Sequence, residues 1–179
     1  MTVGVYPGSF NPPTVAHLAI AEAAWRQAGL ERLDLVVSTT PLGKPEAPAP
    51  ALADRLAVLG AIAASRPWLR VRVSEAQLLV DIAAGYDVLV VGADKWAQVL
   101  DPSWYGGSEA ARDAALAGLP RVLVVPRPPF PVPAAGILTV HDDHLAVSSS
   151  GARLGRRDWV APEALAMLEA DPVRFASWA

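Results

Sequence analysis

Residues 3–17 read Val3-Gly4-Val5-Tyr6-Pro7-Gly8-Ser9-Phe10-Asn11-Pro12-Pro13-Thr14-Val15-Ala16-His17. A short apolar run suited to a buried strand is followed by a turn-rich loop and then by an alanine-rich helical stretch. Thr14 and His17 fall in the first turn of that helix, where unpaired backbone N–H groups and a partial positive charge favour an anion. The stretch therefore predicts a strand, a loop and a helix that together hold a phosphate group.

The composition of the chain favours one folded domain over residues 1–179. Hydrophobic residues make up 53% of the sequence and charged residues 18%, so there is enough apolar surface for a full core. The net charge of −3 argues against a nucleic-acid or anionic-membrane partner, each of which needs a basic face. The sequence has no cysteine, which excludes disulfides, a thiol nucleophile and a cysteine metal site. There is no signal-peptide pattern and no apolar run near the roughly 20 residues that span a bilayer, so we expect a cytoplasmic protein.

Strand-like and helical stretches alternate along the chain. We expect strands at 3–6, 33–38, 69–73, 87–91, 121–125 and 137–140, and helices at 17–28, 51–65, 74–84, 108–117, within 148–155 and at 162–170. Such alternation, with strands apolar on both faces, predicts an α/β fold with a doubly wound parallel sheet. Ligands of such sheets bind beyond the carboxyl ends of the strands, where the strand order reverses. Residues just after Val5, Ser38 and Val91 should therefore share one rim.

Three segments resemble the nucleotidylyltransferase superfamily. The stretch from Gly8 to His17 is similar to its first signature, Thr or His followed by two residues and His. The run Val147-Ser148-Ser149-Ser150-Gly151-Ala152-Arg153 resembles its second signature, Ile-Ser-Ser-Thr-x-x-Arg. Between them, Val90-Val91-Gly92-Ala93-Asp94 looks like the Gly-Ala-Asp segment of the nicotinate- and nicotinamide-mononucleotide adenylyltransferases. The resemblance covers roughly residues 1–157 and implies a Rossmann-like, single-domain nucleotidylyltransferase fold.

The resemblance implies a role for each matching residue. His17 would stabilise the α-phosphoryl oxygens of ATP, and Asp94 would contact a ribose. The leaving pyrophosphate would be held by Thr14, Lys44, Ser149, Ser150 and Arg153. The rest of the expected ATP site is Gly8, Ser9, Phe10, Gly92 and Ser148. Mg²⁺ would bridge the ATP phosphates, without a metal site built from protein side chains.

Simpler interpretations stay open for several of these residues. Thr14 and Asp94 can each cap the helix that they begin, and the three serines can form an ordinary helix cap. For the acceptor we expect Lys44, which lies in a proline-rich loop at 39–50, together with Arg55, Trp96 and Trp104. Only 13 residues separate Val73 from Asp87. The bacterial nicotinate-mononucleotide enzymes usually carry a longer segment here, with an aromatic-Thr element, so the identity of the acceptor is open.

The function implied is transfer of AMP from ATP to nicotinate or nicotinamide mononucleotide, releasing pyrophosphate in NAD synthesis. Cytidylyl transfer is disfavoured because the chain lacks the Arg-Thr-Glu-Gly-Ile-Ser-Thr-Thr signature. The alternatives are a nucleotidylyltransferase with another phosphate-bearing acceptor, such as phosphopantetheine or a sugar phosphate, a non-catalytic ATP-binding homologue, and a hydrolase that forms AMP. The phosphopantetheine branch usually ends the second signature in Lys, whereas this chain has Arg153. A homo-oligomer is compatible with the sequence.

Overall fold

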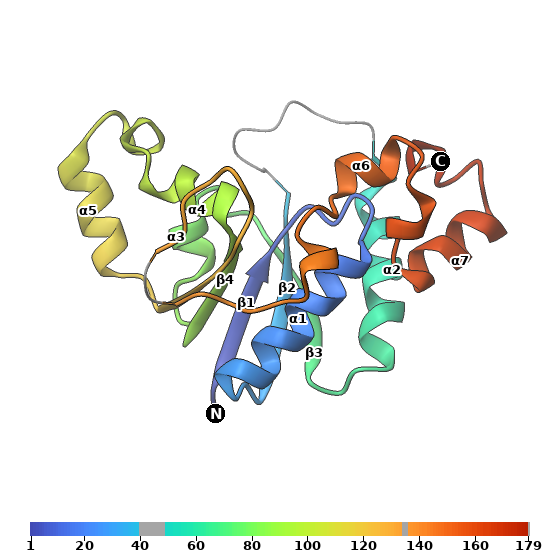
Figure 1. Ribbon diagram of the computed structural model, residues 1–179, viewed down its shortest axis with the longest axis horizontal. Helices are drawn as coiled ribbons and strands as arrows, with labels where there is room; N and C mark the ends of the chain where they lie inside the picture. The colour runs from blue at the N-terminus through green and yellow to red at the C-terminus, as the bar shows by residue number, and fades with distance from the viewer. Residues whose placement is uncertain (40–48, 134–135, 179) are drawn as a thin grey trace.

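A parallel sheet forms the centre of the computed structural model (Figure 1), which describes residues 1–39, 49–133 and 136–178. Within these residues the sheet has five strands in the order β3-β2-β1-β4-β5, each parallel to its neighbours. Their bounds are β1 Val3–Pro7, β2 Arg32–Ser38, β3 Leu69–Ser74, β4 Val88–Gly92 and β5 Arg121–Val125. The chain leaves β1 toward β2 and later returns to pair β4 on its other side. The strand order therefore reverses between β1 and β4, as in doubly wound folds.

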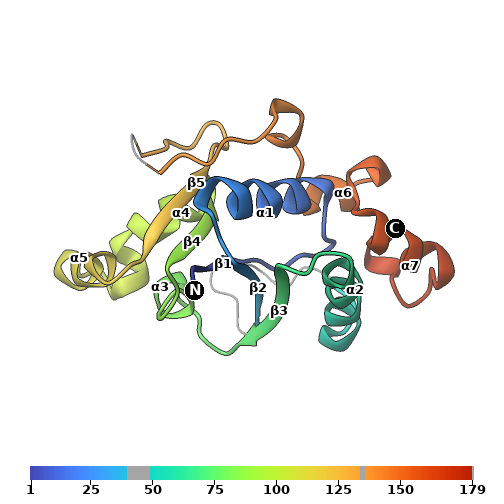
Figure 2. The same cartoon turned by 90° about the horizontal axis from the view of Figure 1, so that it is seen from below.

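Helices cover both faces of the sheet (Figure 2). One face carries α1 Val15–Ala28, α2 Leu52–Ala64, α6 Ser149–Arg153 and α7 Pro162–Ala170. The other carries α3 Leu79–Ile82 and α4 Ala93–Leu100. Helix α5, Glu109–Ala117, projects to one side and has no buried residue. Short 3-10 turns complete the described structure: η1 Pro102–Tyr105, η2 Asp142–His144, η3 Arg157–Trp159 and η4 Ala176–Trp178.

Alternate side chains of the strands fill two separate cores. Tyr6 and Val90 point into the core under α1 and α2, whereas Val5 and Leu89 point into the core under α3 and α4. Successive strand residues face opposite sides, so a strand covered on both faces is apolar at most of its positions. This requirement explains the unbroken apolar runs in the sequence and confirms the predicted doubly wound sheet.

Asp34 is a buried charge in the middle of β2. Its side chain is 1% exposed, and its two oxygens lie 2.9 Å from Arg32 Nε and 3.4 Å from Arg72 Nε. The Tyr86 hydroxyl donates a further hydrogen bond to Oδ2 at 3.0 Å. A buried carboxylate needs such partners to offset its loss of hydration. Arg72 reaches it from β3, which lies at the edge of the sheet.

The tyrosines should make the fold sensitive to high pH. Burial raises the pKa of Tyr6, and burial together with the hydrogen bond to Asp34 raises the pKa of Tyr86 to about 12. Unfolded tyrosine ionises near pH 10, so ionisation favours the unfolded chain. The stability from these two groups is complete below about pH 10 and is lost as the pH rises toward 12. We expect circular dichroism and tyrosinate absorbance to change together above pH 10. Tyrosinate absorbance that develops fully near pH 10 in the folded protein would contradict this expectation.

Two predicted elements differ from the structure. The helix expected at 74–84 shrinks to α3, because the Ser74 hydroxyl accepts the N–H of Ala76 and the Ser38 hydroxyl donates to the carbonyl of Ala76. These local bonds hold the start of the segment in a turn. The strand expected at 137–140 is only an isolated bridge from Ile137 to Val124. None of the helices in the described part of the chain is both long and apolar enough to cross a membrane.

Candidate active site

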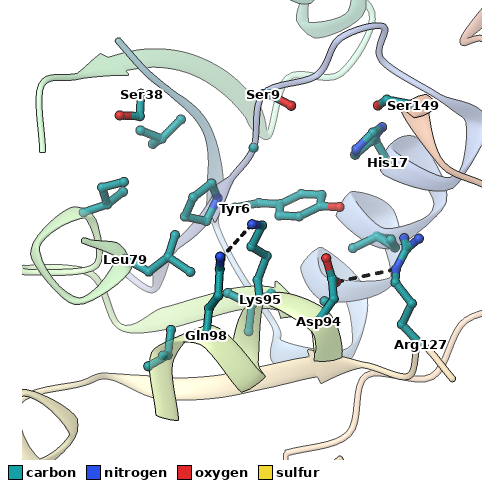
Figure 3. Close-up of a pocket in the computed structure, with 18 of the residues that line it drawn as sticks. Tyr6, Ser9, His17, Ser38, Leu79, Asp94, Lys95, Gln98, Arg127 and Ser149 are labelled. Carbon is teal, nitrogen blue, oxygen red and sulfur yellow. Dashed lines mark hydrogen bonds and ion pairs between the residues drawn. The ribbon is translucent and has the colours of Figure 1, made fainter. Parts of the chain in front are cut away.

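A cavity of about 360 Å³ opens at the carboxyl ends of β1 and β4 (Figure 3). Its volume lies within the range of roughly 300–1,000 Å³ that is usual for small-molecule sites. Ser38 also lines it, so the three strand ends expected on one rim do meet. Lining residues come from segments that are distant in the sequence: 6–9, 14–20, 77–82, 91–99, 104–105, 127 and 147–150. The cavity therefore lies where the topology predicts a ligand.

Thr14 and His17 form a reciprocal cap at the start of α1. The Thr14 hydroxyl accepts the backbone N–H of His17, and the Thr14 N–H donates to His17 Nδ1 at 2.9 Å. A ring nitrogen that accepts an N–H bond carries no proton, so the neutral imidazole bears its proton on Nε2. The cap expected for Thr14 is confirmed. It fixes an imidazole that can act as an N–H donor, and both residues line the cavity.

The buried ring of Phe10 packs against the imidazole of His17. It is 1% exposed, and its ring centroid lies 5.0 Å from that of His17 in an edge-to-face arrangement. Phe10 is not among the described residues that line the cavity, so its predicted place in the ATP site corresponds to packing beneath the site. Gly8 is required here because a Cβ would lie 2.8 Å from the Phe10 ring. The sequence signature thus includes residues that shape the loop as well as residues that face a ligand.

The three serines at the start of α6 face the same cavity as His17. Ser148 caps α6, since its hydroxyl accepts the N–H of Gly151 at 3.1 Å. The Ser149 hydroxyl donates to the carbonyl of Pro12 at 2.8 Å. Arg153 donates to the carbonyl of Asn11 and lies 3.4 Å from the Ser150 hydroxyl. The two signatures are therefore neighbours, although Arg153 contacts the loop rather than lining the described cavity wall.

Asp94 and Arg127 form an ion pair on the opposite wall. Arg127 Nε lies 3.7 Å from Asp94 Oδ1, and Arg127 also donates to the carbonyl of Val147 at 3.4 Å. Helix α4 begins without a side-chain cap, so the simpler interpretation of Asp94 as a helix cap is wrong. A Cβ on Gly92 would lie 2.6 Å from Asp94 Oδ1, and glycine therefore leaves room for the carboxylate. No sequence motif marked Arg127 as a site residue, although it follows a buried strand as a lone cation among prolines.

The described lining of the cavity includes a group of large apolar and aromatic residues: Leu78, Leu79, Ile82, Val99, Trp104 and Tyr105. Helix α4 adds a cation and an amide to the same lining. Lys95 Nζ donates to Gln98 Oε1 at 2.7 Å, and burial lowers the pKa of Lys95 while Asp94 opposes that effect. Neither Lys95 nor Gln98 was predicted as a site residue. Their spacing of three places them on the same face of α4, which begins at the carboxyl end of β4.

Of the four residues expected at the acceptor, three lie in the described part of the chain, and their environments differ. Trp104 lines the cavity, whereas Trp96 packs against the core under α3 and α4. Arg55 donates to the carbonyl of Ser9 at 3.1 Å and does not line the described cavity wall. Burial lowers the pKa of Arg55. Lys44 lies outside the described residues.

The sheet order and the cleft at the reversal point define a Rossmann-like α/β protein. The chain belongs to the cytidylyltransferase-like family, whose model matches residues 5–155. The predicted resemblance to nucleotidylyltransferases is thereby confirmed.

Curated relatives match parts of the chain. A probable nicotinate-nucleotide adenylyltransferase of Salinibacter ruber is 42% identical over 71 residues, which are 40% of this chain and 36% of that protein. One of Mesorhizobium japonicum is 35% identical over 114 residues, which are 63% of this chain and 56% of that protein. The chain therefore covers little more than half, or less, of the length of these relatives.

Solved structures match nearly the whole chain at low identity. Plasmodium falciparum nicotinic acid mononucleotide adenylyltransferase complexed with NaAD has a TM-score of 0.65 at 12% identity, covering 97% of each chain. The same enzyme complexed with APC has a TM-score of 0.67 at 12% identity, covering 97% of this chain and 96% of that one. This likeness establishes the fold.

Proposed function

We propose that this protein transfers an adenylyl group from ATP to nicotinate mononucleotide and releases pyrophosphate. The observation that carries the proposal is the meeting of His17 with Ser149 and Ser150 in one cavity at the strand reversal. Family membership supports nucleotidyl transfer, and the names of the curated relatives support the nicotinate acceptor.

In the proposed reaction a phosphate oxygen of the acceptor attacks the α-phosphorus of ATP. The new bond joins that oxygen to phosphorus, while the bond from the α-phosphorus to the oxygen bridging it to the β-phosphorus breaks and pyrophosphate leaves. His17 would donate its Nε2 proton in a hydrogen bond to an α-phosphoryl oxygen as charge develops there. Thr14, Ser149, Ser150 and Arg153 would hold the leaving pyrophosphate. No covalent intermediate with the protein is needed, because catalysis comes from positioning and charge stabilisation.

We propose that Mg²⁺ is held mainly by the phosphates of ATP. Asp94 is the only acidic side chain among the described residues that line the cavity, and it lies 3.7 Å from Arg127. A divalent ion at Asp94 would therefore compete with a guanidinium. Mg²⁺ binds well through substrate phosphates and water with few protein ligands, and it would neutralise the charge on the phosphates.

The positive charge of Lys95 favours nicotinate mononucleotide over nicotinamide mononucleotide as the acceptor. Lys95 and Trp104 both line the cavity, and a flat pyridine ring can pack against an indole there. A cation in a partly buried pocket attracts a carboxylate more strongly than a neutral carboxamide. We therefore assign nicotinate mononucleotide as the preferred acceptor, with nicotinamide mononucleotide as the alternative.

Lys95→Met should reduce this discrimination. Methionine keeps the length of the side chain and removes its charge. We expect the ratio of kcat/KM for nicotinate over nicotinamide mononucleotide to fall by about tenfold, the scale of one charged hydrogen bond. Steady-state kinetics with both acceptors measure the ratio. An equal loss for both acceptors would show that Lys95 binds a group which they share.

A screen of pyrophosphate release tests the function. ATP is supplied with nicotinate mononucleotide, nicotinamide mononucleotide, phosphopantetheine or a sugar phosphate, and the dinucleotide product is identified by mass spectrometry. We expect turnover with the pyridine nucleotides and the highest kcat/KM with the acid. Turnover with only a non-pyridine acceptor would overturn the NAD assignment. AMP formation without an acceptor would indicate a hydrolase, and ATP binding without pyrophosphate release would indicate a non-catalytic homologue.

A further inference from the structure

The loop Ser9–Pro13, which joins β1 to α1, has a backbone that needs external support. Phe10 has φ 44°, a left-handed conformation that side chains other than glycine seldom adopt. Residues in such conformations persist where surrounding contacts enforce them, and they cluster at functional sites. Three side chains hold this loop by donating hydrogen bonds to its carbonyl groups: those of Arg55, Ser149 and Arg153.

One further support comes from near the end of the described chain. Trp178 Nε1 donates to Asn11 Oδ1 at 2.5 Å, across 167 positions of sequence. Trp178 is 0% exposed and Asn11 is 6% exposed, so the bond is shielded from water. The Trp178 ring stacks on Phe175 with centroids 5.1 Å apart. The turn η4, which contains Trp178, contacts α6, the helix that carries Ser149 and Arg153.

The bond determines how the asparagine is oriented. An indole nitrogen can only donate, so the Asn11 oxygen must face Trp178 and the amide nitrogen must face the other way. Asn11 directly follows Phe10, whose ring packs against His17. A single residue, Phe10, therefore separates Asn11 from the imidazole.

We propose that Trp178 is a positioning residue for the site, acting through Asn11 on the loop Ser9–Pro13 and hence on His17. Its packing alone would stabilise the fold like any buried tryptophan. Its single polar atom, however, bonds to the loop that leads directly into Thr14 and His17. The effect on turnover rests on the proposed function, whereas the effect on the loop does not.

Trp178→Phe is the direct test, because it keeps an aromatic ring and removes the N–H donor. The Asn11 oxygen then stays buried without this partner. We expect kcat for pyrophosphate release to fall about tenfold, with the KM for ATP changing less than threefold. We also expect faster amide hydrogen exchange at Phe10 and Asn11, measured by NMR in the absence of substrates.

Leu168→Val is the matched control, since it removes one methylene from a buried residue of α7, which lies in the same core. It should lower Tm and leave kcat and loop exchange close to those of the parent protein.

A double-mutant cycle with Asn11→Ala and Trp178→Phe tests the same hydrogen bond by removing its acceptor as well as its donor. Asn11→Ala should lower kcat by a similar factor, and adding Trp178→Phe should change it little further, because the shared bond is already lost. Additive losses would overturn the proposal, as would unchanged loop exchange in Trp178→Phe or an equal loss of kcat in Leu168→Val. If the parent protein transfers no adenylyl group, the exchange rates still decide whether Trp178 holds the loop.

Discussion

His17→Ala should lower the rate of pyrophosphate release by about 10²–10³-fold, the loss typical of one preorganised donor at a developing negative charge. The reciprocal cap with Thr14 occupies Nδ1 and leaves the proton on Nε2. The donor is thus oriented before substrate binds. Because its contact with the α-phosphoryl oxygens strengthens in the transition state, the loss should appear in kcat more than in the KM for ATP. Steady-state and single-turnover measurements of pyrophosphate release test this result.

His17→Asn separates catalysis from helix capping. An asparagine oxygen can accept the Thr14 N–H, as Nδ1 does, but the side chain has no atom in the place of Nε2. We therefore expect His17→Asn to retain more thermal stability than His17→Ala while its rate stays as low. Near-normal turnover in either variant would remove His17 from the proposed mechanism.

The strand, loop and helix at the start of the chain could be predicted because local signals agree there. Apolar runs mark β1 and β4, glycine and proline mark the turns, and Gly29 ends α1 in the left-handed conformation, with φ 63°. The resemblance of both signatures to one family also predicted that His17 and Ser149 would lie in the same ATP site. Such a prediction is possible only for residues that stand at fixed positions within a recognisable motif.

The remaining parts of the site depend on which way a side chain turns, which sequence spacing does not reveal. Phe10 turns inward because of its unusual backbone, and Trp96 lies on the core side of α4 while Lys95 lies on the cavity side. The bond from Trp178 to Asn11 joins residues with no local relationship, so no pattern within either segment could indicate it. The single domain over residues 1–179, the role of Lys44 and the oligomeric state stay predictions.

Arg153→Ala should lower kcat/KM for ATP by about 10- to 100-fold, the range expected for losing one or two charged hydrogen bonds. The guanidinium lies between the Asn11 carbonyl and the Ser150 hydroxyl, beside the serines that face the cavity. Arg153→Lys keeps the charge without the planar fork and should recover only part of the loss. Arg157→Ala is the matched control, because this nearby arginine is exposed and should have little effect.

The reverse reaction distinguishes the two roles that the position of Arg153 allows. A residue that holds the leaving group in the forward direction must bind pyrophosphate when a dinucleotide is cleaved to ATP. We therefore expect the KM for pyrophosphate to rise in Arg153→Ala by at least as large a factor as the KM for ATP. If Arg153 only braces the Asn11 carbonyl, kcat falls in both directions while the KM for pyrophosphate stays the same. That outcome would assign Arg153 the same positioning role as Trp178 and leave the phosphates to Thr14, His17 and the serines of α6.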